Sequence, residues 1–257
     1  MKFALITGAS KGIGRAIAYE LAGRKINLLL VARSKGLLEQ LASELKNKYS
    51  IEVYYFVADL AQHEAAEQIH TWCIINNFSV QYLVNNAGYG LSGAFDKYTL
   101  NEHLENMQVN MNALVQLTYL FLPDLKKTSQ GYILNIASSA AYQAVPYLSI
   151  YAATKAFVLQ FSRGLHHELS KTNVSVTCVS PGTTDTSFAE RARVGEKALK
   201  LAEKFNMQPD KVAKIAVDAL FRKKAEVVTG MVNKLGVFIA WLLPKRTVER
   251  ATAKIYE

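Results

Sequence analysis

The sequence predicts a single α/β domain, in which a doubly wound parallel sheet carries helices on both faces. Three observations support this fold class. Short apolar runs alternate along the chain with segments of helical periodicity, the pattern of a parallel sheet with crossover helices. A glycine-rich turn follows the first apolar run. The chain of 257 residues, 50% of them hydrophobic, suits one large domain better than two small ones, and it contains no linker, repeat or low-complexity segment.

The expected strands are short and rich in apolar residues. Lys2–Thr7 opens the chain as such a run. Ile26–Ala32 is apolar at nearly every position, which is typical of a buried strand in a parallel sheet. In chain order the expected strands are Lys2–Thr7, Ile26–Ala32, Ile51–Val57, Val80–Asn85, Gly131–Ala137, Val174–Ser180 and Glu226–Thr229.

The expected helices lie between these strands. Lys35–Lys48 is amphipathic, because its leucines recur on one face of a helix. Asn101–Lys127 is expected to be one long helix, stopped near Pro123. Gly182–Asn206 contains helical patches but no element that we can assign. In chain order the expected helices are Ile13–Arg24, Lys35–Lys48, Gln62–Asn76, Asn101–Lys127, Ser149–Lys171 and Pro209–Arg222.

Composition argues against several classes of protein. Cys73 and Cys178 are far apart and lack a Cys-x-x-Cys partner, so we expect no disulfide framework and a reducing compartment. The five histidines show no metal-ligand spacing, so no metal site is expected. The net charge of +9 comes from cations spread along the chain, which fits a solubilising surface better than a nucleic-acid-binding patch. A strand occupies the first residues in place of a signal peptide, and we expect a cytoplasmic protein.

The turn after the first strand has the composition of a phosphate-binding loop. Its glycines allow a tight turn and let backbone N–H groups approach a pyrophosphate at the N-terminus of the next helix. A plain turn is the alternative, but the position between the first strand and first helix of a Rossmann-type sheet favours phosphate binding. The expected contacts are Gly8, Ser10, Lys11, Gly12, Ile13 and Gly14.

Two cations predict which dinucleotide binds. Where an NAD site needs an acidic residue to hold the ribose hydroxyls, the end of the second strand carries Arg33. A guanidinium cannot accept those hydrogen bonds, but it can bind a 2′-phosphate with two of its own. Lys11 in the glycine-rich loop adds a second cation. The sequence therefore predicts NADP(H), and the alternative is that both residues are ordinary exposed cations.

The ends of later strands supply the rest of the expected cofactor site. Small and amide residues follow the third and fourth strands, where they suit a loop packed against a flat ligand, although alone they could be turn formers. Backbone amides and hydroxyls after the sixth strand could hold a carboxamide. The expected contacts are Asp59, Leu60, Asn86, Ala87, Gly88, Pro181, Gly182, Thr184 and Thr186.

Tyr151 and Lys155 form the candidate acid/base pair, because on a helix they lie one turn apart on the same face. A phenol normally keeps its proton until about pH 10, and a neighbouring ammonium lowers that pKa. The pair is then able to exchange a proton with a carbonyl or an alcohol. For this spacing alone, an aromatic ring in the core beside a solvated lysine is the common alternative. Ser138, at the end of the fifth strand, could hydrogen-bond to a substrate carbonyl.

With these motifs in this order, the chain resembles the short-chain dehydrogenase/reductase family, of the classical type, over about residues 1–230. One mild departure is Thr154 before Lys155, where many members have serine. The residues that carry the resemblance are Thr7, Gly8, Gly12, Gly14, Asp59, Leu60, Asn85, Asn86, Ala87, Gly88, Asn110, Ser138, Tyr151, Lys155, Pro181 and Gly182.

The resemblance implies roles for the catalytic residues. Tyr151 would donate a proton to the carbonyl oxygen, and Lys155 would lower the pKa of the tyrosine and bind the nicotinamide ribose. Ser138 would orient the substrate. Asn110 would bend its helix and hold a water of the proton relay, and it is expected to contribute to the cofactor site as well. Thr186 and the loop before it would fix the nicotinamide.

The resemblance also implies the cofactor and the assembly. Lys11 and Arg33 match the basic residues that the family associates with NADPH. Members usually form dimers or tetramers through two long helices, which correspond here to about residues 101–127 and 151–171. We therefore expect a homodimer or a homotetramer.

The C-terminal part of the chain allows several interpretations. Residues 183–206 are expected to form a substrate lid, whose cations suit either an anionic substrate or carrier or a solvated helix face. Leu235–Leu243 is an apolar run too short to span a bilayer. Within the tail 231–257 it could cover the core or a pocket, the reading we favour for so short a run, make an oligomer contact, or anchor the protein on a membrane surface. The lid cations are Arg191, Arg193, Lys197, Lys200 and Lys204.

We therefore expect an NADPH-dependent carbonyl reductase that acts on a ketone, a 3-oxoacyl group or a similar small molecule, with Tyr151 as general acid/base. No nucleic acid and no membrane partner is expected. One alternative is a dinucleotide-sensing regulatory protein on the same fold, which the presence of Asn110, Ser138, Tyr151 and Lys155 together argues against. A second alternative is a reductase that acts on lipid or acyl ketones at a membrane surface.

Overall fold

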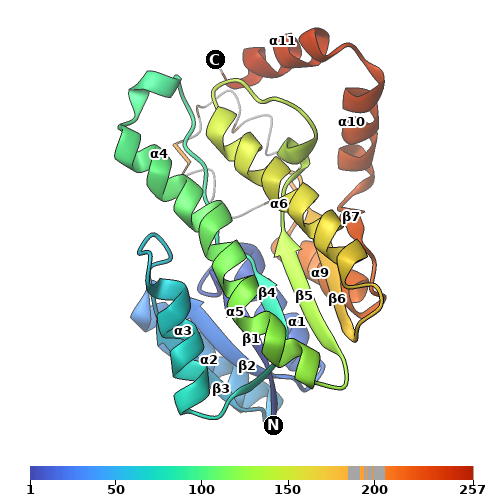
Figure 1. Cartoon of the computed structure of the whole chain (residues 1–257). Helices are drawn as coiled ribbons and strands as arrows, with labels where there is room; N and C mark the ends of the chain where they lie inside the picture. The colour runs from blue at the N-terminus through green and yellow to red at the C-terminus, as the bar shows by residue number, and fades with distance from the viewer. Residues whose placement is uncertain (185–191, 194, 196–198, 200–205, 257) are drawn as a thin grey trace.

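One seven-stranded sheet forms the centre of the molecule (Figure 1). The structure, a computed structural model, describes residues 1–184, 192–193, 195, 199 and 206–256. The strands lie in the order β3-β2-β1-β4-β5-β6-β7, and each neighbouring pair is parallel. Their bounds are β1 Lys2–Thr7, β2 Asn27–Ala32, β3 Val53–Val57, β4 Ser79–Asn85, β5 Gly131–Ile136, β6 Val174–Ser180 and β7 Glu226–Val228.

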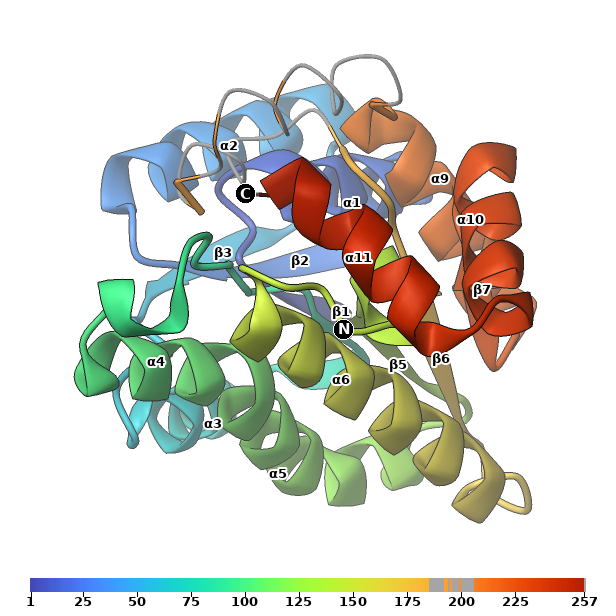
Figure 2. The ribbon, with the colours of Figure 1, turned by 90° about the horizontal axis from the view of Figure 1, so that it is seen from above.

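Helices cover both faces of the sheet (Figure 2). Side chains of a strand alternate between the two faces, so Ile6 packs with α1, α2 and α9 while its neighbour Leu5 packs with α3 and α5. The predicted doubly wound α/β fold is confirmed. The helix bounds are α1 Gly12–Gly23, α2 Lys35–Tyr49, α3 Ala65–Ile75, α4 Leu100–Met107, α5 Ala113–Lys127, α6 Ser149–Glu168, α9 Pro209–Phe221, α10 Met231–Leu242 and α11 Lys245–Tyr256.

The strand order determines where a ligand can bind. Ile6 of β1 pairs with Leu30 of β2 on one side and with Val84 of β4 on the other. From β1 the chain winds outward to β3, crosses back to β4 and then winds in the opposite direction to β7. The crossover helices diverge at this switch point, which leaves a crevice at the carboxyl ends of β1 and β4.

The segment expected to be one long helix is divided in two. α4 and α5 are separated by η2, a π-helical turn over Gln108–Asn112. The expected stop near Pro123 is wrong, because α5 continues through the proline to Lys127. Pro123 and Tyr119, whose carbonyl loses its donor, are both exposed, so water can replace the missing hydrogen bond.

The C-terminal segment forms two helices, and it does not fill the core. α10 contains no buried residue, and Leu235, Phe238 and Trp241 are all exposed. The favoured interpretation of Leu235–Leu243 is a cover of the core or of a pocket, and its core part is therefore wrong. α11, by contrast, packs onto the domain, where Gln143 Nε2 donates to Thr252 Oγ1 at 3.2 Å. Among the described residues, no helix is both long enough and apolar enough to cross a bilayer.

Phe121 on α5 tests how much the packing of the helices onto the sheet contributes to stability. Its side chain is 1% exposed and belongs to the core cluster between α5 and the sheet. Phe121→Ala is expected to lower the free energy of unfolding by about 3–5 kcal/mol, because it removes a buried ring and leaves a cavity. Lys126→Ala, at an exposed position of the same helix, is the control and should change it by less than about 0.5 kcal/mol. Urea unfolding measures both, and equal effects would contradict this assignment of the buried face.

Candidate active site

The loop between β1 and α1 has a conformation that requires glycine. Gly8 and Gly12 have φ angles of +63° and +55°, in the left-handed region. A Cβ atom at Gly14 would collide with the carbonyl oxygen of Gly8 and with the side-chain amide of Asn86. In this described part of the chain, α1 has neither a side-chain cap nor an acidic residue in its first turn, so its N–H groups suit an anion. The turn holds the predicted contacts Gly8, Ser10, Lys11, Gly12, Ile13 and Gly14.

The ends of β1 and β4 are tied together by hydrogen bonds. Thr7 Oγ1 accepts from the backbone N–H groups of Asn86 at 3.0 Å and Ala87 at 3.1 Å. Asn86 Nδ2 in turn donates to the carbonyl oxygens of Thr7 at 2.9 Å and Gly8 at 3.2 Å. The predicted residues Asn86 and Ala87 therefore lie directly against the glycine-rich loop and hold it in position.

Arg33 and Asp59 meet at the ends of β2 and β3. Arg33 Nη1 lies 3.5 Å from Asp59 Oδ2, and their side chains are 53% and 38% exposed. An ion pair this exposed contributes little to stability, so the guanidinium remains available to a phosphate. Leu60 beside them is buried, and Lys11 is exposed in the glycine-rich loop. The structure thus brings together Arg33, Asp59 and Leu60 at the edge where we expected the adenosine half of a dinucleotide.

Tyr151 and Ser138 converge at the carboxyl end of β5. Tyr151 lies in the first turn of α6, and its hydroxyl is hydrogen-bonded to the hydroxyl of Ser138. Ser138 Oγ also accepts from the backbone N–H of Ala140 at 3.1 Å, which fixes the serine side chain. Two hydroxyl groups from different elements are therefore presented at one point.

Asn110 lies in the π-helical turn η2, where the long helix is interrupted as expected for this residue. The side chain is 1% exposed, and its Nδ2 donates to the Tyr89 carbonyl at 2.9 Å and to Thr154 Oγ1 at 3.0 Å. Its Oδ1 accepts from the Tyr89 N–H at 3.1 Å. A Cβ atom at Gly88 would lie 3.1 Å from Asn110 Oδ1 and 3.2 Å from Lys155 Nζ. Asn110, Gly88 and Lys155 are therefore neighbours in space.

Burial sets the proton affinities of the acid/base pair. Burial raises the pKa of Tyr151 to about 12, the hydrogen bond with Ser138 opposes that shift, and the nearby Tyr256 adds to it. Burial lowers the pKa of Lys155 to about 8. Lys155 Nζ donates to the Ile136 carbonyl at 2.8 Å and lies 5.9 Å from the centre of the Tyr151 ring. The expected lowering of the Tyr151 pKa by Lys155 is not found in this structure, because burial raises that pKa and Lys155 is not among the groups that shift it.

The loop after β6 completes the edge of the site. The Pro181 carbonyl accepts from the Ser139 N–H at 2.7 Å, which joins this loop to the segment that carries Ser138. Thr184 Oγ1 donates to the Gly182 carbonyl at 3.1 Å. Thr186 and most of the expected lid over 183–206 lie outside the described residues. So do four of the five lid cations, Arg191, Lys197, Lys200 and Lys204.

Two residues of the C-terminal helices lie at the site although the sequence did not predict them there. Asn233 of α10 lies against Gly182, where a Cβ atom would overlap its amide, and its Nδ2 donates to the Thr229 carbonyl at 2.7 Å. Tyr256 of α11 packs with Tyr151 against the cluster around Leu148. Neither residue belongs to a local motif, since only the path of the chain after β7 brings it here.

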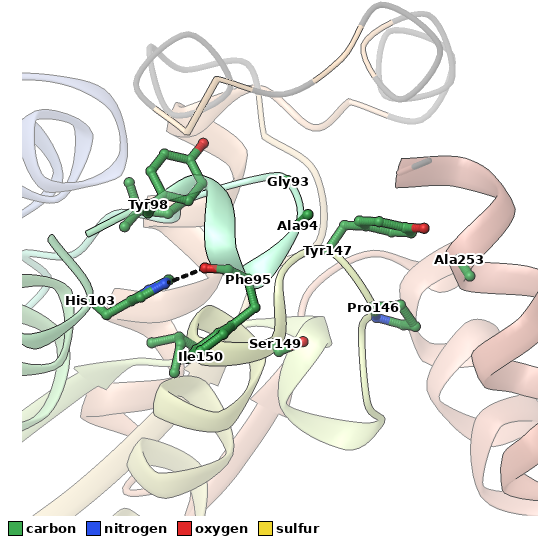
Figure 3. A pocket seen from close by; sticks show the side chains of 11 residues that line it. Gly93, Ala94, Phe95, Tyr98, His103, Pro146, Tyr147, Ser149, Ile150 and Ala253 are labelled. Carbon is green, nitrogen blue, oxygen red and sulfur yellow. Dashed lines mark hydrogen bonds between the residues drawn. The ribbon is translucent and has the colours of Figure 1, made fainter. Parts of the chain in front are cut away.

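An apolar cavity of about 350 Å³ adjoins the start of α6. Ser149 and Ile150, immediately before Tyr151, form part of its wall, and Ala253 of α11 lies on the side opposite Phe95 (Figure 3). His103 Nε2 is hydrogen-bonded to the Phe95 carbonyl at 2.9 Å and its ring stacks on that of Phe95. The apolar lining consists mainly of Leu91, Phe95, Tyr98, Pro146, Tyr147 and Ile150.

Apart from the carboxylate of Asp59, the polar groups named in this site are hydroxyls, amides and cations. Among the residues that the structure describes, no group of three or more histidine, cysteine or acidic side chains could hold a metal ion. Cys73 and Cys178 are buried as free thiols.

Comparison with known proteins agrees with this geometry. The sequence model of the family described as short chain dehydrogenase matches residues 2–197. The chain belongs to this family. The short-chain dehydrogenase motifs predicted from the sequence fall within the matched residues. Solved structures of other proteins have the same fold over nearly the whole chain.

The relatives and the similar solved structures match different shares of this short-chain dehydrogenase. The chain is 37% identical over 195 residues to a very-long-chain 3-oxoacyl-CoA reductase of Anas platyrhynchos, covering 73% of this chain and 61% of that relative. It thus spans about 61% of the length of the relatives it matches. A short-chain dehydrogenase from Sphingobium yanoikuyae in complex with NADPH has a TM-score of 0.83 at 30% identity and covers 94% of both chains. One from Burkholderia phymatum in complex with NAD has a TM-score of 0.83 at 22% identity, over 95% of this chain and 96% of that one, and is alike in fold alone.

A nicotinamide dinucleotide, which the family binds, fits the residues present. Gly14 and Gly88 are positions where a Cβ atom would crowd its neighbours, which are Gly8 and Asn86 at the glycine-rich loop and Asn110 and Lys155 at Gly88. The unpaired N–H groups at the start of α1 suit a pyrophosphate. These features lie in one line along the carboxyl edge of the sheet, from Arg33 at the end of β2 to Gly182 after β6.

The lowered pKa of Lys155 predicts a pH dependence of stability. Between about pH 8 and 10.5 the unfolded chain binds more protons at Lys155 than the folded chain does, so this residue makes stability rise with pH in that interval. Lys155→Met should flatten the rise, by at most about 3 kcal/mol over the interval. Urea unfolding at pH 8, 9 and 10 measures it, with Lys126→Met at an exposed site as the control. A Lys155→Met slope identical to that of the parent chain would contradict the prediction.

Proposed function

We propose that this short-chain dehydrogenase reduces the ketone of a 3-oxoacyl thioester to an alcohol with NADPH. The observation that carries the proposal is the Tyr151–Ser138 hydroxyl pair beside an apolar cavity. The hydroxyls suit a carbonyl oxygen, and the cavity suits an alkyl chain next to that carbonyl. Very-long-chain 3-oxoacyl-CoA reductases are among the relatives, and this supports the substrate class.

The proposed reaction divides the chemistry between cofactor and chain. NADPH supplies the hydride for the carbonyl carbon, and the protein supplies position and a proton. Tyr151 donates its hydroxyl proton to the carbonyl oxygen, while Ser138 hydrogen-bonds to the same oxygen and orients it. A high pKa keeps Tyr151 protonated at neutral pH, which suits a proton donor. The negative charge that develops on the substrate oxygen is the driving force for the transfer.

Lys155 and Asn110 connect the proton donor to the rest of the site. Burial brings the pKa of Lys155 to about 8, so this side chain can gain and lose a proton near neutral pH, as Tyr151 alone cannot. Both Asn110 and Lys155 face Gly88, where the nicotinamide ribose would lie and where Lys155 would bind it. Asn110 would hold the water that returns a proton to this pair.

The preference for NADPH is also part of the proposal. Arg33 stands where an NAD site needs an acid, and the exposed Lys11 adds a second cation in the phosphate loop. The relative with NADPH bound is 30% identical, and the structure with NAD bound is 22% identical. The glycine-rich loop itself serves either dinucleotide, so the choice depends on the contacts of the 2′-phosphate with Arg33 and Lys11.

A cytoplasmic homodimer or homotetramer is the assembly that we propose. The expected interface helices carry exposed aromatic side chains, Tyr119 on α5 and Phe157 on α6. Phe157 stacks on Phe161 with a ring separation of 5.9 Å, which makes a flat apolar surface. Large exposed aromatic residues are typical of interface cores.

Turnover on a panel of ketones tests the reaction. NADPH consumption is expected with 3-oxoacyl thioesters, and it should rise with acyl length until the chain fills the cavity beside Ile150. Tyr151→Phe should lower kcat by about 10²–10⁴-fold while NADPH still binds, because it removes only the proton donor. Tyr119→Phe is the matched control and should keep full turnover.

The same panel separates this function from its alternatives. Turnover of steroid or small ketones with none of 3-oxoacyl thioesters would contradict the substrate class and retain the reductase. Tight NADPH binding without turnover of any compound would favour a dinucleotide-sensing regulatory protein. Full turnover by Tyr151→Phe would contradict the role of Tyr151.

Arg33→Ala tests the cofactor preference. Loss of a charge-assisted hydrogen bond to the 2′-phosphate is expected to weaken NADPH binding by about 10–100-fold and to leave NADH binding nearly unchanged. Fluorescence titration with each cofactor measures the two affinities. Lys35→Ala, an exposed cation that pairs with Glu39, is the control. An equal loss for NADPH and NADH would show that Arg33 does not bind the 2′-phosphate.

A further inference from the structure

Most of the large apolar side chains of α10 are exposed to solvent. Met231 is 77% exposed and Trp241 is 78% exposed. The helix lies at the periphery of the molecule, beside β7 and below α11 (Figures 1 and 2). The other exposed apolar residues of the helix and of its end are Val232, Leu235, Phe238, Ile239, Leu242 and Leu243. A contiguous apolar surface of this kind marks an interaction site.

The charged residues within α10 and directly after it all have one sign. Lys234 lies within α10, and Lys245 and Arg246 follow it directly, at the start of α11. The sequence has no acidic residue between Glu226 and Glu249. The α10 surface, which we define as the exposed apolar residues of 231–243 with Lys234, Lys245 and Arg246, therefore suits a partner that is apolar inside and anionic outside.

A second copy of the chain does not match these charges. In a two-fold dimer the same patch faces itself, so the cations of one α10 surface would approach those of the other, and the surface itself contains no acid to pair with them; Glu249, the next acid along the chain, lies one turn beyond Lys245 on α11. Like charges opposed in this way disfavour association. A membrane span is excluded too, since a helix of 12 residues is about 18 Å long and the apolar core of a bilayer is about 30 Å thick.

We propose that the α10 surface binds the surface of an anionic lipid bilayer. α10 would lie in the plane of the interface, with Leu235 and Phe238 at the boundary between headgroups and acyl chains. Trp241 has an apolar ring and a polar N–H, which suits it to the headgroup level. Lys245 and Arg246 would bind lipid phosphates. The inference goes beyond the proposed reaction and does not depend on it.

The arrangement of the C-terminal helices gives this docking a consequence for the site. Asn233 lies on α10 itself, where it contacts Gly182 of the cofactor edge. Ala253 of α11 lines the apolar cavity. A bilayer bound at α10 would therefore lie next to the helix that walls the cavity, and a lipid substrate would have a short path between them.

Trp241 provides a direct test in the chain of 257 residues. The sequence has two tryptophans, so Trp72→Phe leaves Trp241 as the only one. With vesicles of phosphatidylcholine and phosphatidylglycerol, the emission of Trp241 should shift to shorter wavelength, and the protein should sediment with the vesicles. Vesicles of phosphatidylcholine alone should produce a much smaller effect. Unchanged emission with no sedimentation on the anionic vesicles would overturn the proposal.

Paired variants separate the apolar and charged contributions. Phe238→Ser with Trp241→Ser, and separately Lys245→Glu with Arg246→Glu, should each lower binding to anionic vesicles by more than about tenfold. Matched controls at exposed sites elsewhere are Ile74→Ser with Ile75→Ser on α3, and Lys126→Glu with Lys127→Glu on α5, which should bind as the parent chain does.

A folding check and the oligomeric state distinguish loss of vesicle binding from other effects of the variants. NADPH binding and thermal unfolding of each variant show that it has folded. One outcome is that the parent chain is an oligomer, that Phe238→Ser with Trp241→Ser makes it a monomer, and that neither protein binds vesicles. The α10 surface is then an interface between copies, and the proposal fails. An inactive enzyme that still binds anionic vesicles would contradict the proposed reaction and leave this inference intact.

Discussion

The candidate site depends on the hydrogen bonds of one buried amide, that of Asn110. It satisfies both the N–H and the carbonyl of Tyr89, and it donates to Thr154 Oγ1, which itself donates to the Tyr151 carbonyl. The loop after β4, the interrupted helix and the start of α6 are thereby joined at a single side chain. A buried polar group costs free energy unless it is paired, so removing this amide would leave several groups unsatisfied at once. The π-helical turn explains how a residue inside a helix reaches all of these partners, because it breaks the regular backbone pattern where Asn110 lies.

Buried polar side chains are also paired by hydrogen bonds across the sheet beneath the site. Asn85 on β4 donates to Asn135 on β5, and Asn135 donates to Ser162 on α6. Such polar side chains in a parallel sheet are unusual, since its strands are normally apolar on both faces. Here they connect the strands that carry the site to the helix that carries Tyr151. The position of the proton donor is therefore maintained by directional bonds and by apolar packing together.

The C-terminal helices serve two different surfaces. α11 packs onto the domain, where its Tyr256 packs with Tyr151 and adds, through a charge interaction, to the rise that burial causes in the Tyr151 pKa. α10 reaches the cofactor edge through Asn233 but turns its large apolar side chains outward. Short apolar runs of this length usually fill a core, yet the core of this domain is already closed on that face by α9 and the sheet. The apolar residues of α10 are thus free for a partner.

The sequence by itself determined the fold class, the approximate limits of the strands and of most helices before α10, and the motifs at the strand ends. It could do so because these features depend on local periodicity and on glycines that a tight turn requires, as at Gly8 and Gly12. Only the tertiary structure decided the rest. It showed that α5 continues through Pro123, that burial raises the pKa of Tyr151 despite Lys155 one turn away, and that Asn233 and Tyr256 reach the site. Whether a side chain is buried, and beside which partner, depends on segments distant in sequence, and the exposed face of α10 is the clearest example because the same residues could equally have filled a core.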